Sequence, residues 1–191
     1  MNIKKGQPGY IAGQKKKYGL MALLEFAVVF LILAAGYLLT HSRLNLFTVI
    51  AVVGCLPASK MLAEFIALFP HHTIGEETAE EIKSKAALLT TAFDLVITNK
   101  DKIMPVEAIV ISNYTVFGYA PNPKTDTEYA ADYLKKLLEK NCRRKVTVKV
   151  LAEYVPFLSR VEGLNNMMEV SRSSDRKLEK KIRQIILSTS M

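Results

Sequence analysis

The chain has 191 residues, with 26 lysines and arginines against 18 aspartates and glutamates, and a formal net charge of +8. This length leaves room for one membrane module and one folded domain, and it excludes a large multidomain protein. Half of the residues are hydrophobic, but they are unevenly distributed, with two dense apolar blocks before residue 70. The two cysteines, Cys55 and Cys142, cannot form a disulfide framework, so we expect free thiols in a reducing compartment.

A basic segment, residues 1–18, precedes the first apolar block, residues 19–39. This block contains Glu25 as its single charged residue. About 20 residues are needed to cross a hydrocarbon core of about 30 Å, so the block predicts one membrane span. A cleaved signal peptide is disfavoured because the block is too long, has no small-residue cleavage site and is followed at once by a second block.

The second apolar block, residues 44–69, predicts a second span. It is interrupted by Pro57, Lys60 and Glu64. Proline lacks an N–H group and clashes with the preceding turn, so we expect a kink at Pro57. An alternative is a short span that ends near Pro57 and continues as an amphipathic helix at the membrane interface.

The positions of the basic residues predict the orientation of this transmembrane hairpin. Five lysines precede the first span, whereas the connection between the spans, residues 40–45, holds only Arg43. Positively charged residues stay on the cytoplasmic side of a membrane. We therefore expect a multi-pass protein of the cell membrane with both termini in the cytoplasm.

Two charged residues inside the spans are expected at equal depth. In an antiparallel hairpin that turns near Arg43, residues whose numbers add to about 85 lie side by side, and Glu25 and Lys60 meet that condition. An unpaired charge in a span costs about 2.5–3.5 kcal/mol on insertion scales. The sequence therefore predicts an intramembrane pair, within one hairpin or between hairpins. The alternative is an ion or proton path in an oligomer.

A linker, residues 70–77, leads to a predicted cytoplasmic domain, residues 78–191. Thr78 and Glu81 fit a capping box, which predicts a helix from there to about Ala92. The patterns that follow predict strands over 94–98, 106–112 and 115–119, a helix over 125–141, a strand over 145–151, and helices over 156–170 and 175–187. The fold class expected is an α+β membrane protein: a two-helix hairpin followed by a mixed α/β domain of order α-β-β-β-α-β-α-α.

The last predicted helix has a basic face opposite an apolar stripe. Its N-cap is expected at Ser173, Ser174 or Asp175. The face consists of Arg176, Lys177, Lys180, Lys181 and Arg183. It is compatible with a solvated helix surface, with docking on anionic lipid headgroups, or with binding of nucleic acid.

No motif in the sequence identifies a reaction. A glycine-rich phosphate loop, a cysteine-pair zinc pattern, a serine-centred elbow and a His/Asp/Glu cluster are all lacking, so no cofactor and no metal are expected. Catalysis stays undecided, but the sequence favours a protein that is not an enzyme.

Residues 106–122 nevertheless carry a resemblance to a known fold. This stretch and the order α-β-β-β-α-β resemble the PD-(D/E)xK (restriction-endonuclease-like) nucleases of the NERD type. By that resemblance Glu107 would be the first metal-binding acid. Ala120 stands where the family has glutamate, and Asn122 where it has lysine. The resemblance therefore implies a nuclease fold with a degenerate active site, since carboxylates must hold Mg²⁺ and lysine must orient water.

Three functions follow from these patterns. The first is a membrane-anchored interaction or regulatory domain that binds a protein partner or itself. The second is a membrane-tethered nuclease-like or nucleic-acid-binding effector. The third is an oligomeric channel or an accessory subunit of a transporter, built on the hairpin.

Overall fold

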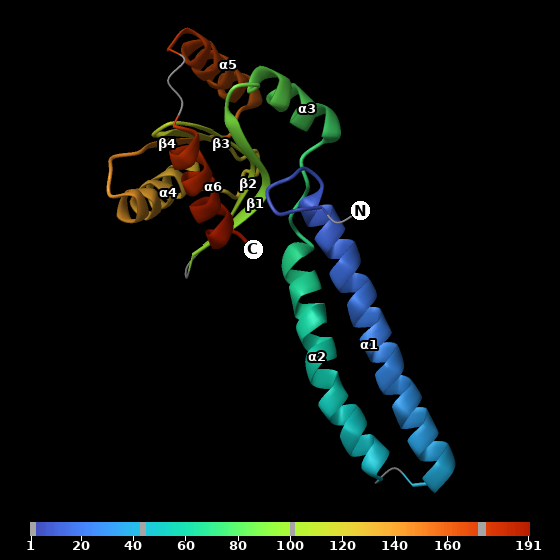
Figure 1. Cartoon of the computed structure of the whole chain (residues 1–191). Coiled ribbons are helices and arrows are strands. Elements are labelled where there is room, and N and C mark those ends of the chain that lie inside the picture. The colour runs from blue at the N-terminus through green and yellow to red at the C-terminus, as the bar shows by residue number, and fades with distance from the viewer. Residues whose placement is uncertain (1–2, 43–44, 100–101, 172–174) are drawn as a thin grey trace. The chain divides into compact units, whose positions relative to one another are not determined.

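The computed structural model describes residues 3–42, 45–99, 102–171 and 175–191 (Figure 1). The predicted roles of Arg43, Ser173 and Ser174 lie outside these residues. The chain divides into two compact units. One is the hairpin unit, Ile11–His72, and the other is the α/β domain, Met1–Tyr10 together with Thr73–Met191. The chain is therefore mixed α/β, and two of its helices are long and apolar enough to cross a membrane.

Six helices and one four-stranded sheet make up the described residues. The helices are α1 (Tyr10–Thr40), α2 (Leu46–Leu68), α3 (Glu76–Lys85), α4 (Thr127–Cys142), α5 (Tyr154–Ser171) and α6 (Arg176–Thr189). The strands are β1 (Thr90–Thr98), β2 (Ile103–Ser112), β3 (Thr115–Tyr119) and β4 (Thr147–Leu151). The predicted element order of the domain is confirmed, and β3 has its predicted bounds.

Helix α1 is longer than the apolar block that predicted it, because it begins at Tyr10 instead of residue 19. Lysine is a good helix former, so the helix also includes Lys15, Lys16 and Lys17. A prediction from hydropathy alone leaves these three residues out of the helix. Helix α2 begins at the N-cap Asn45, whose side chain accepts a hydrogen bond from the Thr48 N–H. It runs through Pro57 as one helix, so the chain stays helical there, and where the membrane span ends stays a prediction.

Small residues bring α1 and α2 together along the hairpin. A side chain added to any of three glycines would lie within 3.2 Å of the opposite helix. The contacts are Gly19 with Phe65, Val29 with Gly54, and Gly36 with Phe47. Their numbers add to 83 or 84, close to the expected 85. Small residues let helices approach closely where no hydrophobic driving force acts between them, as in lipid.

Gly36→Ala is expected to destabilise the hairpin by about 1–3 kcal/mol, because the added Cβ overpacks the contact. That Cβ would lie 2.5 Å from the Cβ of Phe47. The control is Gly163→Ala on α5, where nothing lies within 4 Å of the added atom and alanine should be neutral or stabilising. Thermal unfolding of both variants in the same detergent measures the difference, and equal melting temperatures would contradict the expectation.

The sheet has the order β1-β2-β3-β4. Strands β1, β2 and β3 are antiparallel neighbours, and β4 is parallel to β3. One face is covered by α4 and α6, whose Leu134, Leu138, Ile182 and Ile186 are fully buried in one core cluster. The other face is covered by α3 and α5, which bury a second cluster around Phe157 (Figure 1).

The predicted capping box and the predicted end of the first domain helix are wrong. Helix α3 begins two residues earlier, with Gly75 as an N-cap that makes no side-chain hydrogen bond. It ends at Lys85, and β1 begins at Thr90 instead of residue 94. Thr90, Thr91 and Phe93 prefer extended structure, and their pairing with β2 makes this stretch a strand.

Strand β1 is an edge strand, and both ends of the chain cover it. The Phe93 N–H donates to the Gly6 carbonyl at 3.1 Å. On the same strand Val96 accepts from the Met191 N–H, and Ile97 forms a bridge with Ser190. Covering the edge prevents pairing with other chains. Residues 3–9 thus pack in the α/β domain, whereas the sequence predicted a separate basic segment, residues 1–18.

In strands β1 and β2, the alternation of side chains between the two faces of the sheet is interrupted at neighbouring positions. On β1, Ala92 and Leu95 belong to the same core cluster although two residues separate them. On β2, Val106 and Ile109 do so as well. The residues at the reversal, Asp94 and Glu107, face each other in the register between Phe93–Ala108 and Leu95–Val106. Asp94 has φ of 53°, the left-handed conformation that allows the reversal.

Candidate functional site

Glu107, the acid that the nuclease resemblance singles out, lies half-buried on β2. Ala108 on β2 pairs with Tyr119, the last residue of β3. Glu107 therefore lies opposite Ala120, the residue that follows β3. Ala120 is fully buried, and its N–H donates to the Leu151 carbonyl at 2.9 Å. The place where the resemblance requires a second carboxylate is therefore part of the apolar core.

Asn122, at the position of the family's lysine, has a structural role. Its side-chain oxygen accepts from the Lys124 N–H at 2.9 Å, and its carbonyl accepts from the Thr125 N–H at 2.9 Å. These bonds form the turn that leads into α4. Among the residues that the structure describes, no three His, Cys, Asp or Glu side chains are placed to hold a metal ion. Within the described residues, Ala120 and Asn122 thus take structural roles at the two positions where the family pattern has glutamate and lysine.

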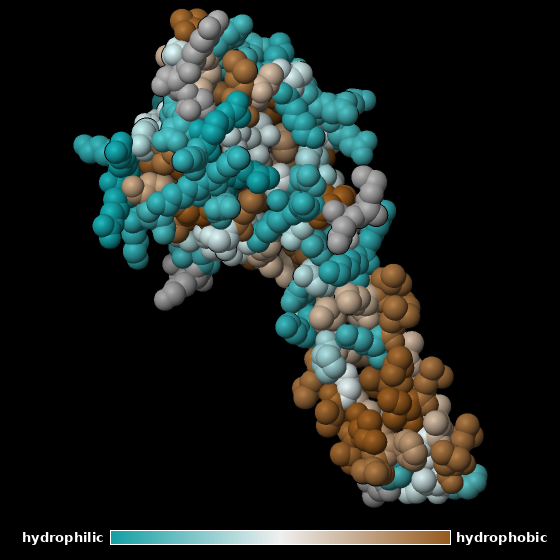
Figure 2. Space-filling view, in the orientation of Figure 1, coloured by the Kyte–Doolittle hydropathy of each residue, from teal (hydrophilic) through white to brown (hydrophobic). Residues whose placement is uncertain are grey.

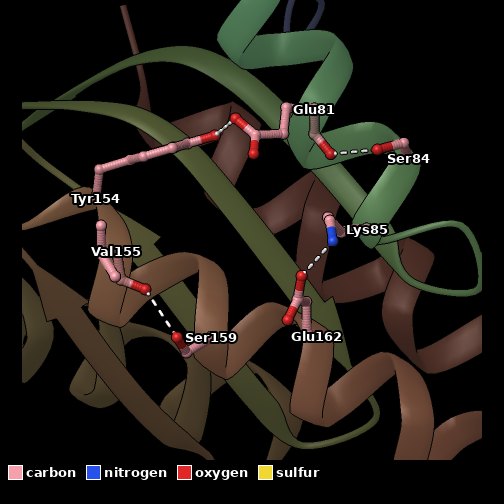
Figure 3. Close-up of polar contacts among 7 residues, drawn as sticks. All are labelled: Glu81, Ser84, Lys85, Tyr154, Val155, Ser159 and Glu162. Atoms are coloured by element: carbon pink, nitrogen blue, oxygen red, sulfur yellow. Dashed lines mark hydrogen bonds and ion pairs between the residues drawn. The ribbon is translucent and has the colours of Figure 1, made fainter.

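Glu107 instead belongs to a group that we call the carboxylate–tyrosine cluster: Glu81, Glu107, Tyr119 and Tyr154. The Tyr154 hydroxyl donates to Glu81 Oε2 at 2.6 Å (Figure 3). The rings of Tyr119 and Tyr154 meet edge to face, 5.5 Å apart. The four residues come from α3, β2, β3 and α5, so spacing in the sequence gave no sign of the cluster.

Both tyrosines are held in the protonated form. Burial, and then the nearby carboxylate of Glu107, raise the pKa of Tyr119. Burial raises the pKa of Tyr154 as well, and the hydrogen bond to Glu81 adds to that effect. The cluster therefore presents two neutral hydroxyl groups beside two acidic side chains, an arrangement that donates and accepts hydrogen bonds.

Tyr154→Phe is expected to reduce the loss of stability at alkaline pH. A tyrosine pKa that is higher in the folded than in the unfolded state stabilises the fold below about pH 10, and this contribution is lost as the pH rises further. Chemical denaturation of the full chain between about pH 9 and 11 should show a weaker pH dependence in the variant. Tyr133→Phe is the control. The hypothesis fails if Tyr154→Phe and the wild type show the same slope.

Helix α3 is held on α5 by two polar contacts, which Figure 3 shows. The first is the Tyr154–Glu81 hydrogen bond, and the second is an ion pair between Lys85 Nζ and Glu162 Oε1 at 2.5 Å. The hydrogen bond to Glu162 and its charge raise the pKa of Lys85. The residue predicted as an N-terminal capping group, Glu81, thus connects two helices.

The basic face of α6 is only partly a free surface. Arg176, Lys177, Lys180 and Lys181 are exposed, as predicted. Arg183 is not, because its Nε donates to the Thr91 carbonyl at 3.0 Å. We call the four exposed residues the basic surface. Helix α4 lies beside α6 on the same face of the sheet and adds further exposed cations: Lys135, Lys136 and Lys140.

Glu25 and Lys60 are not brought together. In the described part of the chain no ion pair joins them, since the only two ion pairs there involve other residues. Lys60 is exposed, whereas Glu25 lies on the side of α1 that also carries the buried Ala22 and Val29. Its Oε2 atom is buried and has no hydrogen-bond partner among the described residues. No ion pair within one hairpin is therefore present among the described residues, and pairing between hairpins stays a prediction.

No family model, no curated protein and no solved structure matches this chain.

Proposed function

We propose that this chain is a membrane-anchored interaction protein. In this proposal the hairpin unit spans the bilayer, both termini lie in the cytoplasm, and the α/β domain binds a partner and catalyses no reaction. The basic surface is the contact that we assign to that partner, which is therefore acidic.

The observation that carries the anchor is the packing of residues 3–9 into the α/β domain. Gly6 binds Phe93 and Gly9 binds Thr73, so the segment before α1 and the domain after α2 form one unit. Two segments of one folded unit must lie on the same side of a membrane. An even number of crossings between them is required, and α1 and α2 supply two.

The surface of the hairpin supports insertion. Large apolar side chains point outward along both helices, as the hydropathy colouring of Figure 2 shows. Leu31, Leu38 and Leu56 are each exposed by about 70%. A water-soluble protein rarely leaves so large a continuous apolar surface uncovered, because burying apolar area gains about 25 cal/mol per Å².

Lys15, Lys16 and Lys17 support the cytoplasmic orientation. They lie in the first turns of α1, just before its apolar part. Lys15 Nζ also donates to the Phe69 carbonyl at 2.9 Å, where it meets the carbonyl groups at the end of α2. A cation at a helix C-terminus is favourable, and three lysines at one end of a span favour the cytoplasmic side.

Labelling of single cysteines tests the topology. In a Cys55→Ala, Cys142→Ala background, Ser42→Cys should react with a membrane-impermeant maleimide in intact cells. Ser188→Cys on α6 should react only after permeabilisation. The proposal fails if Ser188→Cys is labelled in intact cells, or if alkaline carbonate releases the chain from membranes.

Affinity capture from native membranes tests the interaction. The wild type is compared with the variant Lys177→Glu/Lys181→Glu, and Lys124→Glu is a control outside the basic surface. Loss of an acidic protein partner in the first variant alone supports the assignment. An unchanged set of captured proteins in both variants contradicts it.

A second candidate function is binding of nucleic acid by a degenerate nuclease-like domain. The observed order α3-β1-β2-β3-α4-β4 supports it, because this is the order of the fold that residues 106–122 resemble. Binding to DNA or RNA should then weaken steeply with salt, since lysines and arginines release counterions from phosphates. Failure to bind either nucleic acid at low salt rules this function out.

A further inference from the structure

A cavity of about 560 Å³ lies in the α/β domain between α3 and residues 3–9. This is the size of a site for a small molecule. One wall is the face of α3 that carries Glu76, Glu80 and Lys83, and Arg183 of α6 closes the other side. Phe93 of β1 also lines the cavity. We call it the N-terminal slot.

Residues 3–9 form one wall of the slot and lie close to α6. Gly6 and Gly9 have φ of 84° and 85°, which other residues rarely adopt. A side chain on Gly6 would lie 2.8 Å from Leu187 and 3.0 Å from Arg183 Nη2. With the hydrogen bond from Phe93 to Gly6, these contacts fix the wall before any ligand arrives.

The slot carries charges of both signs. Two acids, Glu76 and Glu80, and two bases, Lys83 and Arg183, line one cavity. Among the described residues none of the four forms an ion pair within 4.0 Å. Glu76 and Glu80 are one helical turn apart, a like-charge spacing that destabilises a helix by about 0.2–0.5 kcal/mol. A cation bound between Glu76 and Glu80 would turn this destabilising interaction into a stabilising one.

The two bases are placed for an anion. Lys83 Nζ lies 5.5 Å from the centre of the Phe93 ring, where a cation–π contact holds it over the slot. Arg183 is oriented by its Nε bond to Thr91, which leaves the terminal nitrogens for a ligand. A phosphate group matches this pair, since guanidinium groups bind phosphate oxygens in a fork.

We propose that the N-terminal slot binds an aminoalkyl phosphate, with the amine at Glu76 and Glu80 and the phosphate at Lys83 and Arg183. The same chemistry occurs in a free metabolite and in a lipid headgroup. The site lies within the α/β domain, so it does not depend on the membrane function proposed above.

The probe is O-phosphoethanolamine, titrated by calorimetry into the full chain in a non-ionic detergent. A dissociation constant of about 0.1–1 mM is expected for a ligand of this size. Ethanolamine alone and inorganic phosphate alone should each bind at least about tenfold more weakly, because each lacks one charge-assisted contact.

Substitutions locate the binding. Glu80→Gln and Lys83→Gln should each weaken it by about tenfold or more, while Glu77→Gln, on the same helix but outside the slot, should leave it unchanged. Hydrogen exchange of the Phe93 amide is a second readout. A bound ligand should slow this exchange, because it should stabilise the hydrogen bond from the Phe93 N–H to the Gly6 carbonyl. Nanodiscs with phosphatidylethanolamine, compared with phosphatidylglycerol, test the lipid as the source.

Binding of the free probe, or of phosphatidylethanolamine nanodiscs alone, supports the proposal if it depends on Glu80 and Lys83. Absence of binding to both sources overturns it. Binding that persists in Glu80→Gln and Lys83→Gln, with unchanged exchange at Phe93, also overturns it.

Discussion

Replacing Glu179 with alanine is expected to lower the free energy of unfolding of the α/β domain by about 3–5 kcal/mol. This carboxylate is fully buried at the start of α6. It accepts a hydrogen bond from Thr90 Oγ1 at 2.7 Å and one from the Asn113 N–H at 3.1 Å. Alanine removes both bonds, leaves two half-buried donors behind and opens a cavity between α6, β1 and the β2–β3 turn.

The size of this effect depends on the turn that Glu179 holds. Asn113 has φ of 49°, and its side-chain oxygen accepts from the Asp175 N–H at 2.9 Å. The turn and the N-terminus of α6 therefore fix each other. Denaturant titration followed by circular dichroism measures the loss. Glu179→Gln keeps an acceptor and should cost about half as much, and the exposed neighbour Lys180→Ala should stay within about 0.5 kcal/mol. A loss no larger than that of Lys180→Ala contradicts the expectation.

Asp94→Ala is expected to destabilise the same domain by about 3 kcal/mol. The buried Asp94 carboxylate accepts a hydrogen bond from the Thr73 hydroxyl and one from the Ile74 N–H, the latter at 2.9 Å. It therefore fastens the segment that enters the domain from the hairpin unit. Alanine loses both bonds and keeps an unfavourable left-handed backbone, which aspartate tolerates better than alanine.

Two further variants separate these contributions to the Asp94 effect. Asp94→Asn keeps an oxygen acceptor and the left-handed preference, so it should cost less than Asp94→Ala. In a double-mutant cycle with Thr73→Ala, we expect a coupling of about 1–2 kcal/mol, measured from denaturant midpoints. Strictly additive losses would show that the Thr73 hydroxyl does not stabilise the domain through Asp94.

Much of the fold was predictable because local patterns and tertiary packing agree. The valines of β4 alternate with polar residues, and Asp175 caps α6 as expected, accepting from the Leu178 N–H at 3.1 Å. Prediction failed where the two disagree. The stretch from Lys85 to Leu89 is rich in the helix formers alanine and leucine, but the threonines that follow it pair with β2 in the sheet.

The candidate site was less predictable, because its geometry depends on contacts between distant segments. Nothing near Arg183 in the sequence indicates that the Thr91 carbonyl removes it from the basic face. Neither does the sequence show that Tyr154 would bind Glu81, or that residues before α1 would form one wall of a cavity. For Glu25, the sequence gives a position along the span but not which side chains of the neighbouring helix it meets.

The covered edge of β1 also affects how the chain is made. At about 5–20 residues per second, the ribosome produces Gly6 roughly 4–17 seconds before its partner Phe93, and it produces Ser190 a similar time after Val96. During synthesis the first segment therefore waits without a partner while the hairpin is being made. A nascent chain that stalls within α6 has an open strand edge, which is a template for aggregation. Synthesis of α6 through Ser190, and not the formation of the sheet alone, is the step that covers this strand edge.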